Sequence, residues 1–171
     1  WLKSRPPPVR SQKPPLSSSV IGMKDNPEIF FGHLLESGAG EYDFFTSFKE
    51  SQIAGAVEYR NIVLEFAEYT SGICAMFVME EGQIRVILEA RTPKMVSKRI
   101  LEDLFKRDSD EIASKIGMAL EWQEPSEKYG CYRVSIIHEF PSIRTDRTFK
   151  NFLESLISSM NEMVMALRSY E

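Results

Sequence analysis

Only two cysteines and two histidines occur among the 171 residues of this chain. Cys74 and Cys131 do not form a C-x-x-C pair, and His33 and His138 stand far apart. A zinc site needs clustered cysteine and histidine ligands, so this composition argues against a metal. Isolated thiols within apolar segments are typical of packed cysteines in a reducing compartment. We therefore expect no metal and no cofactor.

Long apolar runs are also lacking. No stretch approaches the ~20 apolar residues that a membrane helix needs. The N-terminus is rich in proline, serine and arginine, and it has no apolar core of a secretory signal. We therefore expect a cytoplasmic protein with no membrane partner.

The charges are distributed unevenly along the chain. The net charge is −4, yet residues 1–20 hold no acid and four bases, namely Lys3, Arg5, Arg10 and Lys13. Taking this +4 from the net charge of −4 leaves −8 for the other residues. Phosphate groups repel such an acidic body, so we do not expect it to bind nucleic acid non-specifically. The basic segment could still contact a polyanion.

Proline marks the same N-terminal segment, in Pro6–Pro8 and Pro14–Pro15. Proline favours the extended polyproline II conformation, so we predict that residues 1–22 are a Pro/Ser-rich basic linker or tail. Residues 23–171 then form one α+β domain. The first residue is Trp1 rather than Met, so we expect a fragment of a longer chain with a preceding domain.

The spacing of apolar residues predicts elements in the order α-βββ-α-ββ-α. Asn26-Pro27 is a typical helix start, and Gly38 and Gly40 are predicted to end that first helix. Three strands are then expected at 61–67, 72–79 and 84–90. A helix from Pro93 to Gly117, which could restart at Asp108, follows them. The last elements are strands near Leu120–Trp122 and at 131–138, and a long helix from Thr145 to Ser169. We expect a five-stranded, mainly antiparallel sheet with helices packed on it.

The sharpest catalytic candidate is Glu89-Ala90-Arg91, at the end of the third expected strand. Restriction-type nucleases bind Mg²⁺ through an acid, a spacer and a Lys on one strand, with an Asp on the preceding strand. Here Arg replaces Lys, and the preceding strand sequence contains no Asp. The alternative is an exposed ion pair at a strand end. We therefore predict no catalytic residue and do not expect this chain by itself to be an enzyme.

Two other groups of polar residues can be interpreted either as functional sites or as ordinary surface residues. His138 beside Glu139 could be a general base, or it could be a surface histidine next to a charge at a strand end. A possible anion or nucleic-acid contact consists of basic residues in and near the middle helix and on the fifth strand, namely Arg91, Lys94, Lys98, Arg99 and Arg133. Glu102 and Asp103 follow directly, so a solvated helix face is the alternative.

Alternation along the fourth and fifth strands could bring Trp122 and Arg133 to one face of the sheet. The guanidinium would then stack on the indole, a contact worth ~1 kcal/mol or more. The alternative is that Trp122 fills the core and Arg133 binds a carboxylate such as Glu121.

The last helix carries apolar residues at alternating spacings of four and three, namely Phe149, Leu153, Leu156, Met160, Met163 and Leu167. This heptad seam predicts a homodimer formed through the C-terminal helix. Phe152, Ile157 and Val164 widen the apolar stripe, so one part could pack on the sheet and the other on a second copy. The alternative is that the whole stripe covers the chain's own sheet.

Several spaced features carry a family resemblance, namely Phe30-Phe31, FFTSFKES at 44–51, YTSGI at 69–73, IRVILEA at 84–90, DEIASKIGMALEWQE at 110–124 and the later Arg133. Through these features the chain, from about Phe30 to Tyr170, resembles an uncharacterised prokaryotic family, the domain of unknown function 4268. Ala113 departs from the family's pattern, in which a Glu is expected at this position.

The resemblance implies a setting rather than a reaction. Members of that family have no assigned activity and often follow the catalytic domain of predicted nucleases or other prokaryotic defence proteins. The chain would then be a non-catalytic accessory domain for docking, dimerisation or substrate positioning in a DNA-acting, restriction- or defence-type protein, with nucleic acid contacted through an attached domain. The alternative is a stand-alone protein-binding module, because small acidic secretion chaperones share the expected order of elements and are dimers.

Overall fold

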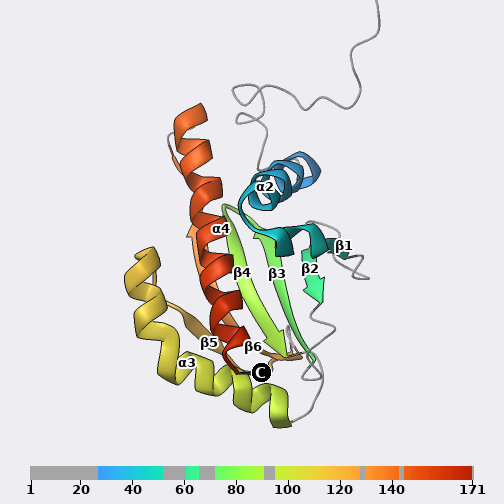
Figure 1. Cartoon of the computed structure of the whole chain (residues 1–171), viewed down its shortest axis with the longest axis vertical. Coiled ribbons are helices and arrows are strands. Elements are labelled where there is room, and N and C mark those ends of the chain that lie inside the picture. Colours follow the sequence, from blue (N-terminus) through green and yellow to red (C-terminus); the bar gives the residue numbers. More distant parts are fainter. Residues whose placement is uncertain are drawn as a thin grey trace, which may run out of the picture.

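The computed structural model describes residues 27–51, 61–65, 72–90, 95–127, 130–142 and 145–170. The elements follow in the order α2 (Pro27–Glu41), η3 (Asp43–Ser47, a 3-10 helix), β1 (Lys49–Ser51), β2 (Asn61–Glu65), β3 (Ile73–Glu80), β4 (Gln83–Ala90), α3 (Met95–Ile116), β5 (Glu121–Gln123), β6 (Tyr132–Glu139) and α4 (Asp146–Arg168). The α+β class predicted from the sequence is confirmed (Figure 1). The tail predicted over residues 1–22 lies outside the described residues.

Among the described residues the sheet has six strands in the order β1-β2-β3-β4-β6-β5, and every neighbouring pair is antiparallel. This sheet has one strand more than the five expected from the sequence. The additional strand is the three-residue β1, which pairs with β2 at one edge. β6 follows β5 in the chain but lies between β4 and β5. The two longest described pairings, β3 with β4 and β4 with β6, form the centre of the sheet.

The three α-helices of the described residues pack on one face of the sheet, here called the helix face (Figure 1). Side chains of α2, α3 and α4 form one apolar cluster with alternate residues of β3, β4 and β6, such as Phe77, Val86 and Ile136. The opposite face, here called the far face, holds a second and smaller buried cluster of Cys74, Met76, Val78 and Ile87. β3 is thus buried on both faces, as its continuous apolar sequence predicted.

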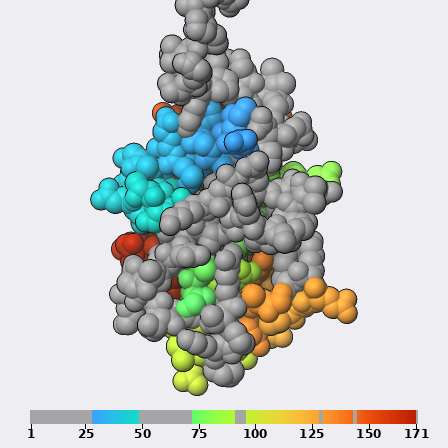
Figure 2. Space-filling view, turned by 90° about the vertical axis from the view of Figure 1, so that its right-hand side faces the viewer, coloured from blue at the N-terminus to red at the C-terminus, as the bar shows by residue number. Residues whose placement is uncertain are grey.

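α2 does not end at its glycines, in contrast to the prediction, but runs to Glu41. Gly38 is buried, and a Cβ atom at this position would lie 2.2 Å from Cδ2 of Phe45 in η3. The missing side chain of Gly38 therefore lets the aromatic ring pack directly on the helix. The space-filling view shows α2 and η3, in blue and cyan, side by side on the surface (Figure 2).

The two long helices have clear end signals. α3 is continuous from Met95 to Ile116, so the predicted restart at Asp108 does not occur, and Gly117 follows with a positive φ of 76°. α4 begins after Thr145, whose side chain accepts a hydrogen bond from the backbone N–H of Thr148 in a capping box. The predicted span of α4 is confirmed to within one residue at each end.

Candidate functional site

Glu89 and Arg133 form the most buried ion pair on the far face within the described part of the chain. They occupy opposite positions on β4 and β6. The Nε and Nη2 atoms of Arg133 lie 2.8 and 2.7 Å from Oε1 of Glu89, and the two residues are only 6% and 8% exposed. The two charge-assisted contacts in this geometry offset part of the cost of removing both charges from water. Glu89 is thus held by an arginine, whereas Arg91 of the sequence motif lies outside the described residues.

Two further polar side chains lie next to this pair on the far face. Gln123 of β5 is opposite Arg133, and Ser135 of β6 is opposite Ile87. The Oε1 atom of Gln123 and the Oγ atom of Ser135 are buried and have no hydrogen-bond partner among the described residues. For Ser135 the available sequence signal is the alternation in β6, where the polar residues Arg133 and Ser135 flank Val134.

The predicted stacking of Arg133 on Trp122 is wrong. Trp122 is opposite Val134, so its side chain lies on the helix face. Its ring centroid is 6.0 Å from that of Phe105 and 5.7 Å from that of Tyr132. Arg133 lies on the other face, because successive residues of a strand point to opposite sides. The alternative that Arg133 binds a carboxylate is correct, but the partner is Glu89 rather than Glu121.

His138 is not the surface residue that its neighbour Glu139 suggested. It is 1% exposed, on the helix face beneath α4, and its Nε2 atom lies 2.7 Å from Oγ of Ser159. Burial lowers the pKa of His138 to about 4. Its Nδ1 atom is buried without a hydrogen-bond partner in the described residues. A neutral, enclosed imidazole of this kind stabilises the contact between β6 and α4 and is not placed to act on a substrate.

Neither Ser135 nor Ser159 forms an accessible serine–histidine pair with His138. Ser135 and His138 are three positions apart on β6, so their side chains lie on opposite faces of the sheet. Ser159 contacts His138, but it is fully buried within α4. No group of three or more histidine, cysteine, aspartate or glutamate side chains with metal-binding geometry occurs in the described ranges.

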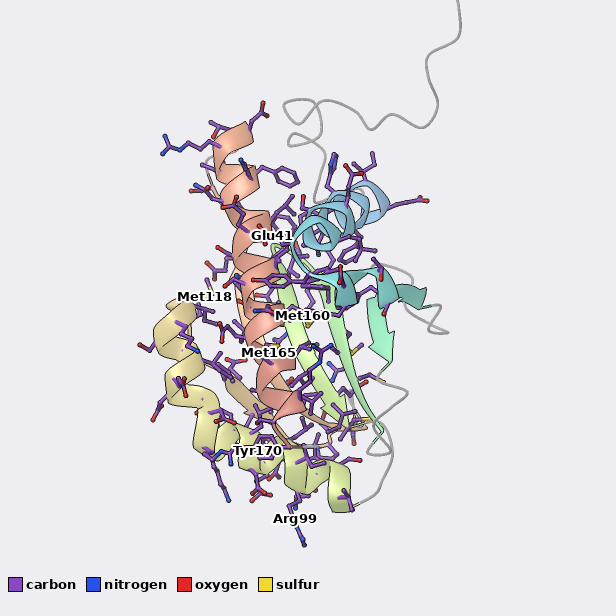
Figure 3. The ribbon with its side chains drawn as sticks, viewed as in Figure 1. Glu41, Arg99, Met118, Met160, Met165 and Tyr170 are labelled. Carbon is purple, nitrogen blue, oxygen red and sulfur yellow. The ribbon has the colours of Figure 1, made fainter. Side chains whose placement is uncertain are left out.

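The basic residues predicted to form an anion contact are not brought together by the described structure. Arg91 and Lys94 lie outside the described residues. The Nζ atom of Lys98 lies 5.0 Å from the ring centroid of Tyr132, whereas Arg99 is exposed and points away from the body of the protein (Figure 3). Arg133 is buried in its ion pair on the far face. The structure thus gives no single basic surface formed by Lys98, Arg99 and Arg133.

The apolar seam of α4 lies in the core of this chain. All six of its members are at most 5% exposed, and the three residues of the second row are buried too. Met160 faces the sheet (Figure 3). Met165, by contrast, is 51% exposed, and it is the only exposed large apolar side chain of α4 among the described residues. The seam residues Phe149, Leu153, Leu156, Met160, Met163 and Leu167 therefore cover the sheet, and the surface proposed for a homodimer is not exposed.

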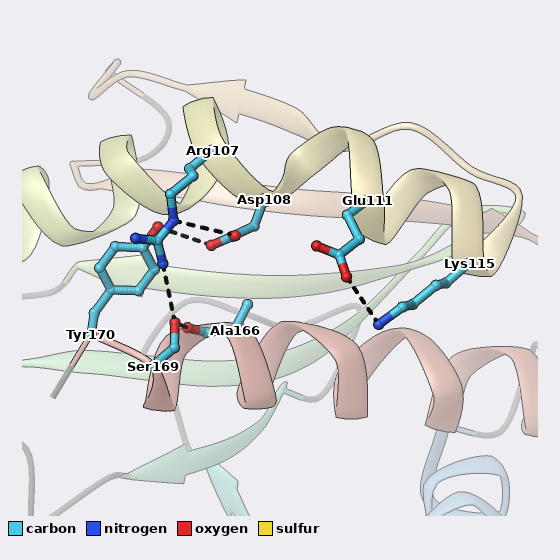
Figure 4. Close-up of polar contacts among 7 residues, drawn as sticks. All are labelled: Arg107, Asp108, Glu111, Lys115, Ala166, Ser169 and Tyr170. Atoms are coloured by element: carbon cyan, nitrogen blue, oxygen red, sulfur yellow. Dashed lines mark hydrogen bonds and ion pairs between the residues drawn. The ribbon is translucent and has the colours of Figure 1, made fainter.

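A polar cluster joins the middle of α3 to the C-terminal end of α4 (Figure 4). The hydroxyl of Tyr170 donates a hydrogen bond of 2.9 Å to Asp108, and the guanidinium of Arg107 lies 4.4 Å from the ring centroid of Tyr170. Burial and the neighbouring Asp108 raise the pKa of Tyr170 to about 12. A shallow pocket beside the cluster is lined by Asp103, Lys106, Arg107 and Tyr170. The mixed charges of this lining favour a structural contact rather than an anion site.

Comparison with family models, curated proteins and solved structures gave no match to this chain. The resemblance inferred from the sequence therefore stays a prediction. In the described ranges, none of the helices combines the length and the apolar character that crossing a membrane requires.

Proposed function

We propose that this chain is a non-catalytic accessory module that provides docking or substrate positioning in a DNA-acting, restriction- or defence-type prokaryotic protein. The observation that carries the proposal is that the candidate catalytic side chains are engaged inside the fold, Glu89 with Arg133 and His138 with Ser159. Using either group on a substrate would break a buried polar contact, at a cost of several kcal/mol for the ion pair. The DNA-acting setting is supported by the sequence resemblance alone.

A stand-alone protein-binding module with a secretion-chaperone-like fold is the second candidate. It is favoured by the order of the described elements, in which one helix, a run of strands, a second helix, two strands and a last helix follow one another. This likeness concerns architecture, and architecture alone does not determine function. Dimerisation through the α4 seam, which both candidates could have used, is not part of either proposal, because the seam is buried.

A nuclease assay tests the leading proposal. The 171-residue chain is incubated with supercoiled plasmid and with a linear duplex in Mg²⁺ or Mn²⁺, beside the Glu89→Gln variant. We expect intact DNA in every lane. Robust cleavage that disappears in Glu89→Gln would overturn the proposal, because it would assign catalysis to the side chain that we place in a structural ion pair.

The genomic sequence upstream of Trp1 separates the two candidates. An open reading frame that encodes a nuclease-type domain before this segment supports the accessory role. A start codon directly before Trp1 removes that support and favours the stand-alone module.

A further inference from the structure

The outer edge of β6 is only partly covered by β5. β6 runs from Tyr132 to Glu139, but β5 pairs only with Arg133, Val134 and Ser135. The last four residues of β6 extend beyond this pairing, and no other described strand lies beside them on that side. In Figure 1 this end of β6 runs beside α4 and away from β5.

The backbone groups of Ile137 and Glu139 point to this open edge. The backbone N–H of the next residue, Phe140, donates a hydrogen bond of 3.0 Å to Gly82 O, on the β4 side. In an antiparallel ladder, successive residues direct their N–H and C=O groups alternately to the two sides. Ile137 and Glu139 therefore have the opposite orientation to Phe140.

The side chains along this edge determine which segment fits it. Ile137 is half-buried and Glu139 is exposed, and both lie on the far face. Glu121 on β5 is also exposed, with 52% of its side chain accessible, and it is 3.6 Å from the nearest nitrogen of Arg85. Arg85 itself is also bound to Glu80. The two exposed charged side chains described at this edge, Glu121 and Glu139, are acidic, and they favour a basic partner.

We propose that the edge from Ile137 to Glu139 accepts an extended segment of a partner protein as an added antiparallel strand. Such strand addition obtains affinity from backbone hydrogen bonds and specificity from alternate side chains. On the far face, a basic side chain of the segment lies opposite Glu139, and an apolar one lies opposite Ile137. Because the strands run in opposite directions, the segment has the pattern basic-x-apolar. The proposal rests on the docking function proposed above and names its partner class.

Two other occupants fit this edge less well. Two copies of the chain that paired through their β6 edges in the register centred on His138 would place Glu139 opposite Ile137, and the acidic side chains would have no basic partners. The chain's own basic segment contains Pro6–Pro8 and Pro14–Pro15. Proline has no N–H to donate and is poorly suited to a paired strand.

A peptide titration tests the proposal directly. The probe is the blocked peptide acetyl-Thr-Arg-Thr-Val-Thr-amide, which is added to the ¹⁵N-labelled 171-residue chain and followed by NMR. We expect the largest shifts at the amides of Ile137 and Glu139, and at least fivefold weaker binding of the peptide with Glu in place of Arg. Absence of shifts at these two amides at millimolar peptide would overturn the proposal.

Variants of the chain provide the matched comparison. Ile137→Pro removes the outward N–H and leaves the hydrogen bonds to β4 intact, so we expect a folded protein by circular dichroism that binds the peptide at least fivefold more weakly. Glu139→Lys should weaken binding similarly, whereas Glu154→Lys makes the same charge change at an exposed site on α4 and should not. Equal binding by the wild type and a folded Ile137→Pro variant would contradict the proposal.

Sedimentation equilibrium tests whether a second copy of the chain, rather than a partner segment, occupies the β6 edge. A dimer of the wild type that Ile137→Pro converts to a monomer would show that a second copy fills the edge, and it would overturn the assignment to a partner segment. This result is independent of the nuclease assay. Failure of strand addition and failure of the accessory function can thus be distinguished.

Discussion

Glu89 and Arg133 lie directly opposite each other on the two strands β4 and β6 and form an ion pair on the side of the sheet that faces away from the helices. Both side chains are nearly inaccessible to solvent. The pair therefore stabilises the alignment of two central strands that are separated in the chain by α3 and β5. A slip of β6 by one residue would move Arg133 to the helix face and bury its charge among apolar side chains.

Arg133→Met should destabilise the protein by roughly 3–5 kcal/mol, because the carboxylate of Glu89 remains buried without its arginine. The double variant Glu89→Leu/Arg133→Met removes both charges and should lose less stability than the single variant. Urea denaturation followed by circular dichroism measures the free energy of unfolding of each protein. If the single variant is as stable as the double variant, the ion pair is not the buried contact that we describe.

The burial of His138 should make the stability of the protein depend on pH. In the unfolded chain its pKa is near the ordinary 6.5, whereas burial lowers the folded-state pKa to about 4. As the pH falls below 6.5, the unfolded chain binds a proton that the folded chain does not. The free energy of unfolding should therefore fall by roughly 2–3 kcal/mol between pH 6.5 and pH 4 from this residue, with no effect above pH 7.

The variant His138→Gln isolates this effect from that of the carboxylates. It will be less stable at pH 7, because it replaces a ring that contacts Ser159 and Phe152. Its stability should nevertheless fall less steeply between pH 6.5 and pH 4 than that of the wild type. Parallel curves for the two proteins in this pH range would contradict a buried, neutral His138.

Two glycines of α2 form a matched pair with opposite expectations. Gly38→Ala places a Cβ atom within 2.2 Å of the Phe45 ring, so it should destabilise the protein by about 1–3 kcal/mol through overpacking. A Cβ atom at Gly40 has no neighbour within 4 Å among the described residues. Gly40→Ala should therefore stabilise the helix by about 0.5–1 kcal/mol. Thermal unfolding compares the two variants, and equal melting temperatures would contradict the close contact of α2 with η3.

The sequence predicted the elements that have strong periodicity or strong end signals. α4 has both, with an apolar stripe over its whole length and Thr145 at its start. β1 was missed because a strand of three residues shows no measurable alternation. The positions of Arg133 and His138 depend on how β6 aligns with β4 and how α4 covers it, and both are tertiary relationships that the local pattern does not contain.

The apolar seam predicted on α4 is a second case in which the local sequence pattern does not determine a tertiary relationship. A stripe with heptad spacing indicates which side of α4 is buried, but it does not distinguish a partner helix from the chain's own sheet. The width of the stripe was the available signal for the second possibility, because Phe152, Ile157 and Val164 are buried together with the seam. A broad stripe is expected for a helix that covers a sheet.

Leu156→Glu tests whether the α4 stripe is core. Leu156 is completely buried, so a carboxylate there should unfold the chain or lower its melting temperature by more than 10 °C, at a cost of about 4 kcal/mol or more. Met165→Glu makes a comparable change at the exposed position of the same helix and should shift the melting temperature by at most a few degrees. Thermal circular dichroism and sedimentation equilibrium of both variants give the answer. A Leu156→Glu protein that remains folded, and that is monomeric where the wild type is a dimer, would show that the stripe is an interface and that its burial against the sheet is incomplete.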